Sequence, residues 1–422
     1  MGRYTDTLDD QAMCIDPMEE DYQEKLLETA RLFRGFADAL TSFLCTHGYE
    51  KDRDDTEAKV YFLRERFRSA GDIPVPRNLR SWFDGNKKIS RKTAFQVCFA
   101  LGLDAEDTND FFRRVQFERS FDCHTISEAV YYFCLRKGKS YWEAEVILEQ
   151  VGTAKRSRTL PVGEIVYTTS LQKDIESLPC EDDLVAYLKA RAEDFGYHNA
   201  TAIRLLQHLW ARISGPDGLA EREGRLIDRM MNSAHTFPAN GQTAESRQKG
   251  ETGQAEQDFR QDELVISERD ASTWTIYAQI MGLDRYQAGK YAASRSLTPV
   301  LTENILLPLR AADCFPSRQT IDNILRGLSG DYEPLRKMII FLSFYSFWAG
   351  RIVEAGDAYV EAGPGDSSRC LALMEKYLTD AGYPPLYYGN PYDWIFLWAM
   401  NDTCPLPAFR GYILEVFDVS QS

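Results

Sequence analysis

The sequence predicts an all-α fold of several helices with little or no β structure, because apolar residues recur at intervals of three and four along most of the chain. The clearest such stripe comprises Leu27, Ala30, Phe33, Phe36, Leu40 and Leu44. Strand-like alternation is confined to the short segment 164–169. The hydrophobic fraction of 44% and the charged fraction of 27% are ordinary for a folded globular protein. We therefore expect a globular protein with about two or three domains in its 422 residues.

A polar stretch at 233–262 is the clearest domain boundary, since it is rich in Gly, Gln, Glu and Ser and almost free of large apolar side chains. Such a segment buries too little apolar surface to offset its ordering entropy, which predicts a linker or a disordered loop. A weaker break falls at 155–161, where basic residues meet a proline. The expected parts are a flexible acidic N-terminus at 1–22, a helical domain at 23–154, a helical middle region at 155–232 and a C-terminal helical domain at 263–422.

The location expected from the sequence is the cytoplasm. The first residues are acidic and lack a basic start followed by an apolar run, which argues against a secretory signal or a transit peptide. The longest apolar stretch, 338–349, is too short to span a bilayer and contains Ser343 and Ser346, so we expect a buried helix there and no contact with a membrane. Nine cysteines without a repeated CxxC spacing fit reduced thiols.

No sequence motif points to catalysis, a cofactor or a metal. The five histidines are dispersed and belong to no HExxH motif, and neither a GxxxxGKS/T loop nor a GxGxxG run after a predicted strand is present. The nearest approach to a metal cluster is Cys123 and His124 with Cys134, which lacks a fourth ligand and is interpreted as a set of buried structural residues. Paired carboxylates such as those at 181–183 lie at predicted helix starts, where negative charge meets the helix dipole. We therefore expect a non-enzymatic protein.

The strongest local pattern lies at 74–117. A short helix at 77–83 is expected to end at Gly85, whose missing Cβ permits the left-handed backbone that stops a helix. Ser90 supplies an N-cap for a second helix at 91–101, and a glycine directly after that helix closes it. The pattern predicts two short helices joined by a polar loop.

This stretch resembles the latter half of the helix-turn-helix domain of the lambda-repressor-like, or Xre, family. The matching positions are Leu79, Trp82, Gly85, Ser90 and the run Ala100-Leu101-Gly102-Leu103. The resemblance covers residues 28–117 and implies that Leu79 and Trp82 belong to the core. The residues that it places toward DNA are Arg77, Asn78, Arg80 and Ser81. The preceding predicted helix, 57–70, departs from the family, since Phe67 stands where a small alanine is usual.

Positive charge is concentrated in the same segment, although the whole chain has a net charge of −15. Between positions 64 and 92, nine basic residues stand against three acidic ones, which gives a net charge of +6. Such a patch can contact phosphates while the acidic remainder faces away. The complete set of candidate DNA-binding residues is Arg77, Asn78, Arg80, Ser81, Lys87, Lys88, Arg91 and Lys92. An ordinary solvated helical surface is the alternative interpretation.

A second stretch, 316–345, repeats the same plan. Its residues Ile321, Ile324 and Gly327 each lie 242 positions after Leu79, Trp82 and Gly85. After a one-residue deletion, its residues Leu335, Met338 and Leu342 fall opposite Ala94, Val97 and Leu101. The candidate binding residues of this second module are Arg318, Gln319, Thr320 and Asn323. Two interpretations stay open, namely a duplicated helix-turn-helix-like module and a coincidence between two helices that follow a glycine turn.

The C-terminal stretch, 379–417, combines a proline- and tyrosine-rich loop with amphipathic helices, and it resembles an element of bacterial helix-turn-helix proteins. We interpret it as an aromatic cap over a helical core rather than as a ligand pocket.

Two functions follow from these features. The first is a DNA-binding regulator, for example of a mobile element or of a stress or defence locus. In that function the basic patch docks on double-stranded DNA, and the C-terminal part senses a signal, binds a protein or self-associates. The second is a non-enzymatic interaction scaffold or sensor that has the helix-turn-helix shape but does not bind DNA. The local positive charge favours the first function, and the acidic exterior favours the second.

Overall fold

The computed structural model describes residues 3–15, 19, 24–25, 28–29, 32–71, 73–84, 89–152, 168–196, 199–234, 279–280, 323, 326, 332–357 and 360–418. The regular structure of these residues consists of helices without a strand, so the prediction of an all-α fold is confirmed. The predicted linker lies outside the described residues from position 235 onward. Residues 164–167 of the strand-like segment 164–169 and the predicted break at 155–161 also lie outside them, and residues 168–169 begin helix α9 (Thr168–Ser177).

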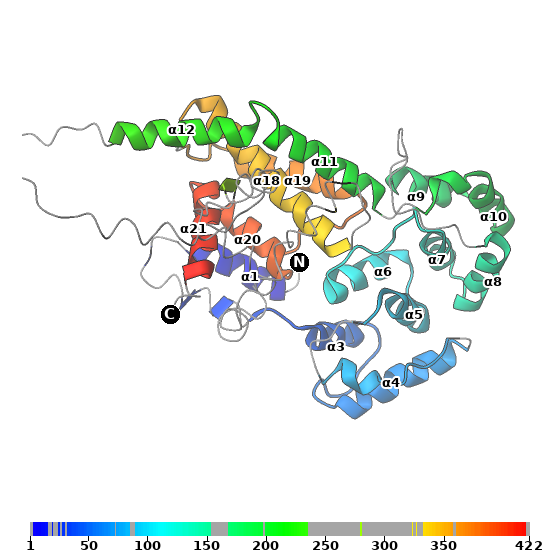
Figure 1. Ribbon diagram of the computed structural model, residues 1–422. Helices are drawn as coiled ribbons and strands as arrows, with labels where there is room; N and C mark the ends of the chain where they lie inside the picture. The colour runs from blue at the N-terminus through cyan, green and yellow to red at the C-terminus, as the bar shows by residue number, and fades with distance from the viewer. Residues whose placement is uncertain are drawn as a thin grey trace, which may run out of the picture.

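The elements are short to medium helices, arranged as Figure 1 shows. In the first half of the chain they are α1 (Arg3–Cys14), α3 (Phe36–Thr46), α4 (Thr56–Ser69), the 3-10 turn η1 (Leu79–Trp82), α5 (Arg91–Leu101), α6 (Ala105–Phe111), the π-helical turn η2 (Phe112–Gln116), α7 (Ile126–Arg136), α8 (Tyr141–Val151), α9 (Thr168–Ser177), α10 (Glu181–Ala190) and the 3-10 turn η3 (Ala192–Asp194). In the second half they are α11 (Ala200–Ser214), α12 (Leu219–Ala234), α18 (Tyr332–Ala355), α19 (Asp366–Asp380), α20 (Pro391–Ala399) and α21 (Pro405–Asp418).

These helices bury two hydrophobic cores, which Figure 1 shows as two groups side by side. Helices α3 to α10 form the first core, and α1, α11, α12 and α18 to α21 form the second. The predicted middle region 155–232 is therefore not one unit, because α9 and α10 belong to the first core whereas α11 and α12 pack on α18. The prediction failed because periodicity shows that a helix has an apolar face but not which core that face joins.

The expectation of a flexible acidic N-terminus is wrong for the described residues 3–15. Helix α1 places Leu8, Ala12 and the following Ile15 in the second core, where all three are buried. The indole nitrogens of Trp394 and Trp398 donate to the carbonyl oxygens of Leu8 and Ile15, at 3.1 and 3.0 Å. An acidic helix of this length gains most of its stability from tertiary packing, so its composition alone suggested an unfolded end.

Helix α5 begins and ends at the predicted residues. The hydroxyl of Ser90 accepts from the amide of Thr93 at 3.2 Å, which caps the helix start. Gly102 follows the last helical residue with a φ of 68°, the left-handed conformation expected of a closing glycine. The helix predicted at 57–70 is also confirmed as α4, whose N-cap Asp55 accepts from the amide of Ala58 at 2.9 Å.

The predicted short helix at 77–83 is wrong in type and in length. The chain forms a single 3-10 turn, η1, with amide-to-carbonyl bonds from Ser81 to Asn78 and from Phe83 to Arg80. The side-chain hydroxyl of Ser81 also donates to the carbonyl of Asn78, at 2.7 Å. Such local side-chain bonds compete with an α-helix, and 3-10 pieces are common where only one turn is made.

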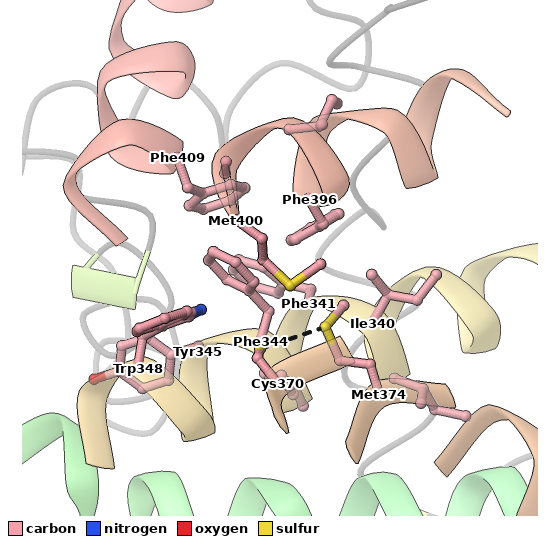
Figure 2. Packing of buried hydrophobic residues seen from close by; sticks show 14 of the residues in the cluster. Ile340, Phe341, Phe344, Tyr345, Trp348, Cys370, Met374, Phe396, Met400 and Phe409 are labelled. Atoms are coloured by element: carbon pink, nitrogen blue, oxygen red, sulfur yellow. Dashed lines mark hydrogen bonds between the residues drawn. The ribbon is translucent and has the colours of Figure 1, made fainter. Parts of the chain in front are cut away.

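The apolar stretch 338–349 lies within α18 and is buried except for the half-buried Phe347, which confirms the predicted buried helix. By length and composition alone, Pro334–Ala355 could cross a membrane, and 67% of its most apolar window is buried inside the protein. Figure 2 shows Phe341 and Phe344 of α18 beside Phe396 of α20 and Phe409 of α21. This aromatic packing confirms that the C-terminal helices cover a helical core.

Buried or half-buried Arg–carboxylate pairs occur in both cores, and one pair in each core occupies a corresponding place. In the first core, Arg91 at the start of α5 makes two hydrogen bonds to Glu128 on α7, at 2.7 and 2.6 Å. In the second core, Arg336 on α18 makes two hydrogen bonds to Asp393 on α20, at 2.5 and 2.7 Å. We call these pairs the first clamp and the second clamp.

The backbone groups that bond to the two clamps also occupy corresponding positions. Arg91 donates to the carbonyl of Ser120 and Arg336 to that of Pro385, two carbonyls that lie 265 positions apart. Glu128 accepts from the amide of Asp122 and Asp393 from that of Tyr387, again 265 positions apart. Helices α7 and α20 also start 265 positions apart. The segment from α5 to α8 and the segment from α18 to α21 thus repeat one arrangement.

This repeat corrects the alignment expected from the sequence. The clamps place Arg91-Lys92 opposite Arg336-Lys337, an offset of 245 positions. Ala94 then corresponds to Ile339 rather than to Leu335, one helical turn further along α18. The sequence could not fix this register, because the stretch 338–349 of α18 is apolar on most sides and accepts several alignments.

The two cores meet through η2 and the segment that follows it. Arg119 donates to the carbonyl of Ala381 at 2.9 Å, and Arg113 donates to that of Leu386 at 3.1 Å. The guanidinium of Arg119 also lies 5.3 Å from the ring centre of Tyr383. These contacts tie the two cores into a common body.

Candidate nucleic-acid interface

Helix α4, the turn η1 and helix α5 form one packed unit. Helix α4 contacts both other elements, and Phe67 on its inner face is fully buried. Leu79 and Trp82 of η1 are buried as well, as the resemblance implied. The ammonium group of Lys59 lies 4.9 Å from the ring centre of Phe83 and holds the end of η1 against α4. This packing leaves the outer sides of α4 and η1 at the surface.

Four candidate residues in and before η1 are exposed, namely Arg77, Asn78, Arg80 and Ser81. Arg80 is partly neutralised, because it lies 2.5 Å from Glu57 and 3.4 Å from Asp84. Arg77 pairs with no carboxylate among the described residues. Of the two arginines in this group, Arg77 therefore carries the less compensated positive charge.

Arg91 has a structural role and leaves the candidate set. Its guanidinium makes the first clamp with Glu128 and donates to the carbonyls of Arg119 and Ser120. All of these partners lie in the body of the first core, so the group is not free to meet a phosphate. The sequence could not show this, because Glu128 is 37 positions away. The neighbouring Lys92 is exposed.

The remaining candidates lie mostly outside the described residues. Lys87, Lys88 and Gly85 fall in the gap between 84 and 89. Arg318, Gln319 and Thr320 of the second module also fall in a gap. Of the second-module candidates, the structure describes Asn323, which is half-buried.

Helix α4 carries exposed cations that the candidate set omitted. Arg64 and Arg68 lie on its outer face, in line with the exposed ring of Tyr61. The ammonium group of Lys51 lies 5.8 Å from the centre of that ring. The sequence already places Arg64 and Arg68 three and seven positions after Tyr61, which is the spacing of one helix face. The resemblance, however, implied DNA contacts from the residues around η1.

We group the exposed cations of this packed unit under the name α4/η1 surface. Its members are Arg64, Arg68, Arg77, Arg80 and Lys92. The carboxylate Glu65 pairs with Arg68 at 2.7 Å, but both side chains are exposed, and such pairs contribute only about 0–1 kcal/mol. A phosphate backbone can therefore displace the acidic partners at little cost.

The cysteines nearest to the candidate metal cluster are buried and unreactive. Burial raises the pKa of the Cys98 and Cys123 thiols and raises that of Cys134 to about 12, so these sulfurs stay protonated and inert at neutral pH. Cys123, His124 and Cys134 are buried, as interpreted from the sequence, and the Nδ1 atom of His124 lies 3.0 Å from the carbonyl of Asp194. Among the described residues no group of three side chains is arranged to hold a metal ion.

Comparisons of the chain with family models, with curated proteins and with solved structures give no match.

Proposed function

We propose that this chain is a non-enzymatic, cytoplasmic DNA-binding regulatory protein that contacts double-stranded DNA through the α4/η1 surface. The observation that carries the proposal is the gathering of exposed cations on one packed unit of an otherwise acidic protein. A chain with a net charge of −15 repels DNA at long range, so a local surface of this kind is what phosphate binding requires. The resemblance of this segment to the lambda-repressor-like family supports the same function.

The proposed contacts are mainly to phosphates. A recognition helix reads bases by lying in the major groove, whereas η1 comprises only Leu79–Trp82 and makes a single turn. Arg64 and Arg68 on α4 extend the positive surface beyond η1, and Lys92 extends it along α5. Phosphate contacts position a protein on DNA without reading its sequence. We therefore propose binding that depends strongly on salt and selects weakly among sequences, with Arg77 and Asn78 as the side chains nearest to a role in base contact.

The test is a salt titration of wild-type protein on a random-sequence DNA duplex, followed by fluorescence anisotropy. The proposal expects the logarithm of the affinity to fall linearly as the logarithm of the salt concentration rises. A single-stranded competitor of equal charge serves as the control for non-specific attraction. Duplex binding that is absent at low ionic strength would rule the proposal out.

The second candidate function is an interaction scaffold or sensor that does not bind DNA. The observation that favours it is the ion pairing of Arg80 with Glu57 and Asp84, which removes part of the charge at the centre of the surface. In this case the same unit contacts a protein, and the duplex titration gives no salt-sensitive binding.

A further inference from the structure

Helix α4 carries an aromatic ring that the packing of the first core does not use. The side chain of Tyr61 is 56% exposed, and no hydrogen bond joins its hydroxyl to another described residue. Other tyrosines of the first core donate through their hydroxyls to a backbone carbonyl or a carboxylate, namely Tyr49, Tyr131, Tyr132 and Tyr187. The position of Tyr61 therefore has no explanation in the stability of the core.

The ring of Tyr61 lies among cations. Arg64 and Arg68 follow it at three and seven positions on the same face of α4, and both are exposed. The ammonium group of Lys51 lies 5.8 Å from the ring centre, close to the outer limit of about 6 Å for a cation–π contact. Such a contact is weak at an exposed site, so another group can take the place of the ammonium on the ring.

Carboxylates also lie near this ring, but cations or backbone amides engage several of them. Glu57 pairs with Arg80, and Glu65 pairs with Arg68 at 2.7 Å. In the loop before α4, Asp55 caps the helix by accepting from the amide of Ala58. Arg64 pairs with no carboxylate among the described residues, so it supplies an uncompensated positive charge one turn after Tyr61.

The spacing of the two arginines suits one strand of nucleic acid. Arg64 and Arg68 lie one turn, or about 6 Å, apart along the axis of α4. A DNA strand carries one phosphate for about every 3.4 Å of duplex axis, so a strand beside α4 offers a phosphate to each arginine. The ring of Tyr61 then lies beside the same strand. In an intact duplex both faces of every base are covered by neighbouring bases, whereas an unpaired base has a face that the ring can reach.

We propose that the α4/η1 surface prefers duplex DNA with an unpaired base, on which Tyr61 stacks while Arg64 and Arg68 hold the adjacent phosphates. This inference rests on the proposed function, since it uses the same surface. Stacking on an aromatic ring tolerates any sequence, because every base has a π face. An unpaired base also leaves the helical stack at the smallest cost. Tyr61 thus gives selectivity for the form of the DNA to a surface whose phosphate contacts select weakly among sequences.

A single strand without a duplex is the less suitable partner. Arg77 and Lys92 lie outside α4, before η1 and on α5, and offer phosphate contacts to the duplex that adjoins the unpaired base. A strand that follows α4 alone leaves these cations unused.

The experiment uses the full chain and two fluorescent duplexes of about 20 base pairs, or two helical turns, which differ only by one unpaired adenine at the centre. Anisotropy titrations give the ratio of the two affinities. Wild type should bind the duplex with the unpaired base about fivefold or more tightly, the smallest effect usual for one stacked base. Tyr61→Ala should bring the ratio to about one, and Tyr61→Phe, which keeps the ring, should retain it. With 2-aminopurine in place of the unpaired adenine, wild type and Tyr61→Phe should quench its fluorescence and Tyr61→Ala should not.

Trp142→Ala is the matched control, because Trp142 is also 56% exposed but lies on α8, and this variant should keep the wild-type ratio. Equal affinity of wild type for both duplexes would overturn the inference, as would a preference that persists in Tyr61→Ala. In either case salt-dependent duplex binding would leave the proposed function standing. Binding to the duplex with the unpaired base alone, lost in Tyr61→Ala, would support the inference and contradict the proposed function. No binding to either duplex would overturn both. Tighter, Tyr61-dependent binding of the single strand alone would assign the ring to single strands and also overturn the inference.

Discussion

The two clamps have the same chemistry in different surroundings. The side chains of Arg336 and Asp393 are 6% and 0% exposed, whereas those of Arg91 and Glu128 are 17% and 8% exposed. Helices α1, α11 and α12 join the second core around the second clamp, and the first core instead carries the exposed cations of the α4/η1 surface. The comparison teaches that the same clamp can hold helices together in surroundings that differ in burial and charge.

The largest expected effect is the loss of the second clamp. Asp393→Ala leaves the guanidinium of Arg336 buried without its carboxylate, which typically destabilises a protein by about 3–5 kcal/mol. Glu128→Ala should destabilise less, because solvent reaches Arg91 and its backbone acceptors remain. Urea unfolding monitored by circular dichroism measures both variants. Equal losses, or a larger loss for Glu128→Ala, would break the comparison between the clamps.

A smaller effect is expected from a substitution in α1, which packs on the second core and has no counterpart in the first. Leu8→Ala removes a fully buried side chain of α1 and should destabilise the protein by about 2–4 kcal/mol. Met13→Ala is the control on the same helix, since Met13 is 67% exposed. The free energy of unfolding should fall for Leu8→Ala alone. Wild-type stability of both variants would indicate that α1 does not pack on the second core and that the N-terminus is flexible, as its composition suggested.

The smallest effects concern carboxylates with lowered pKa values. Burial alone would raise the pKa of Asp366, but the Gly363 amide and the guanidinium groups of Arg369 and Arg351 outweigh it, so this pKa lies below its ordinary value. A lowered pKa contributes stability that is complete above the unfolded value of about 3.9 and is lost as the pH falls through the folded value. The stability advantage of wild type over Asp366→Asn should therefore shrink below about pH 4.

Glu143 provides the matched case in the first half. The amide and the hydroxyl of Ser140 lower its pKa, but its side chain is 36% exposed. Glu143→Gln should accordingly show the same trend with a smaller amplitude when the urea midpoints of both variants are measured from pH 7 to pH 3. A pH-independent difference for Asp366→Asn would show that its carboxylate is not the group that titrates.

Local features were predictable from the sequence, and distant contacts were not. Helix α5 was predicted to the residue, because Ser90 and Gly102 act on their own neighbours. The pairing of Arg91 with Glu128 was missed, because it joins residues 37 positions apart whose types also suit a solvated surface. The prediction of a helix at 77–83 was wrong for a local reason. The bonds of Ser81 to Asn78 favour a tighter turn than apolar spacing alone suggests.

The exposure of the candidate residues was predictable in part. The net positive charge between positions 64 and 92 pointed to the packed unit of α4, η1 and α5, and Arg77, Arg80 and Lys92 are exposed there. Arg64 was counted in that charge but not chosen as a site residue, because the resemblance favoured η1. Exposure depends on how α4 packs, which only the fold reveals.

The most direct test of DNA binding compares charge reversals on the two halves of the chain. Arg64→Glu and Arg77→Glu act on the α4/η1 surface, and Arg212→Glu reverses an exposed arginine of α11. The measurement is the slope of log affinity against log salt on a random duplex. Each of the first two variants should weaken binding and lower the slope by about one, since each removes a phosphate contact, and Arg212→Glu should match wild type. Equal slopes for all four proteins would contradict the proposed interface.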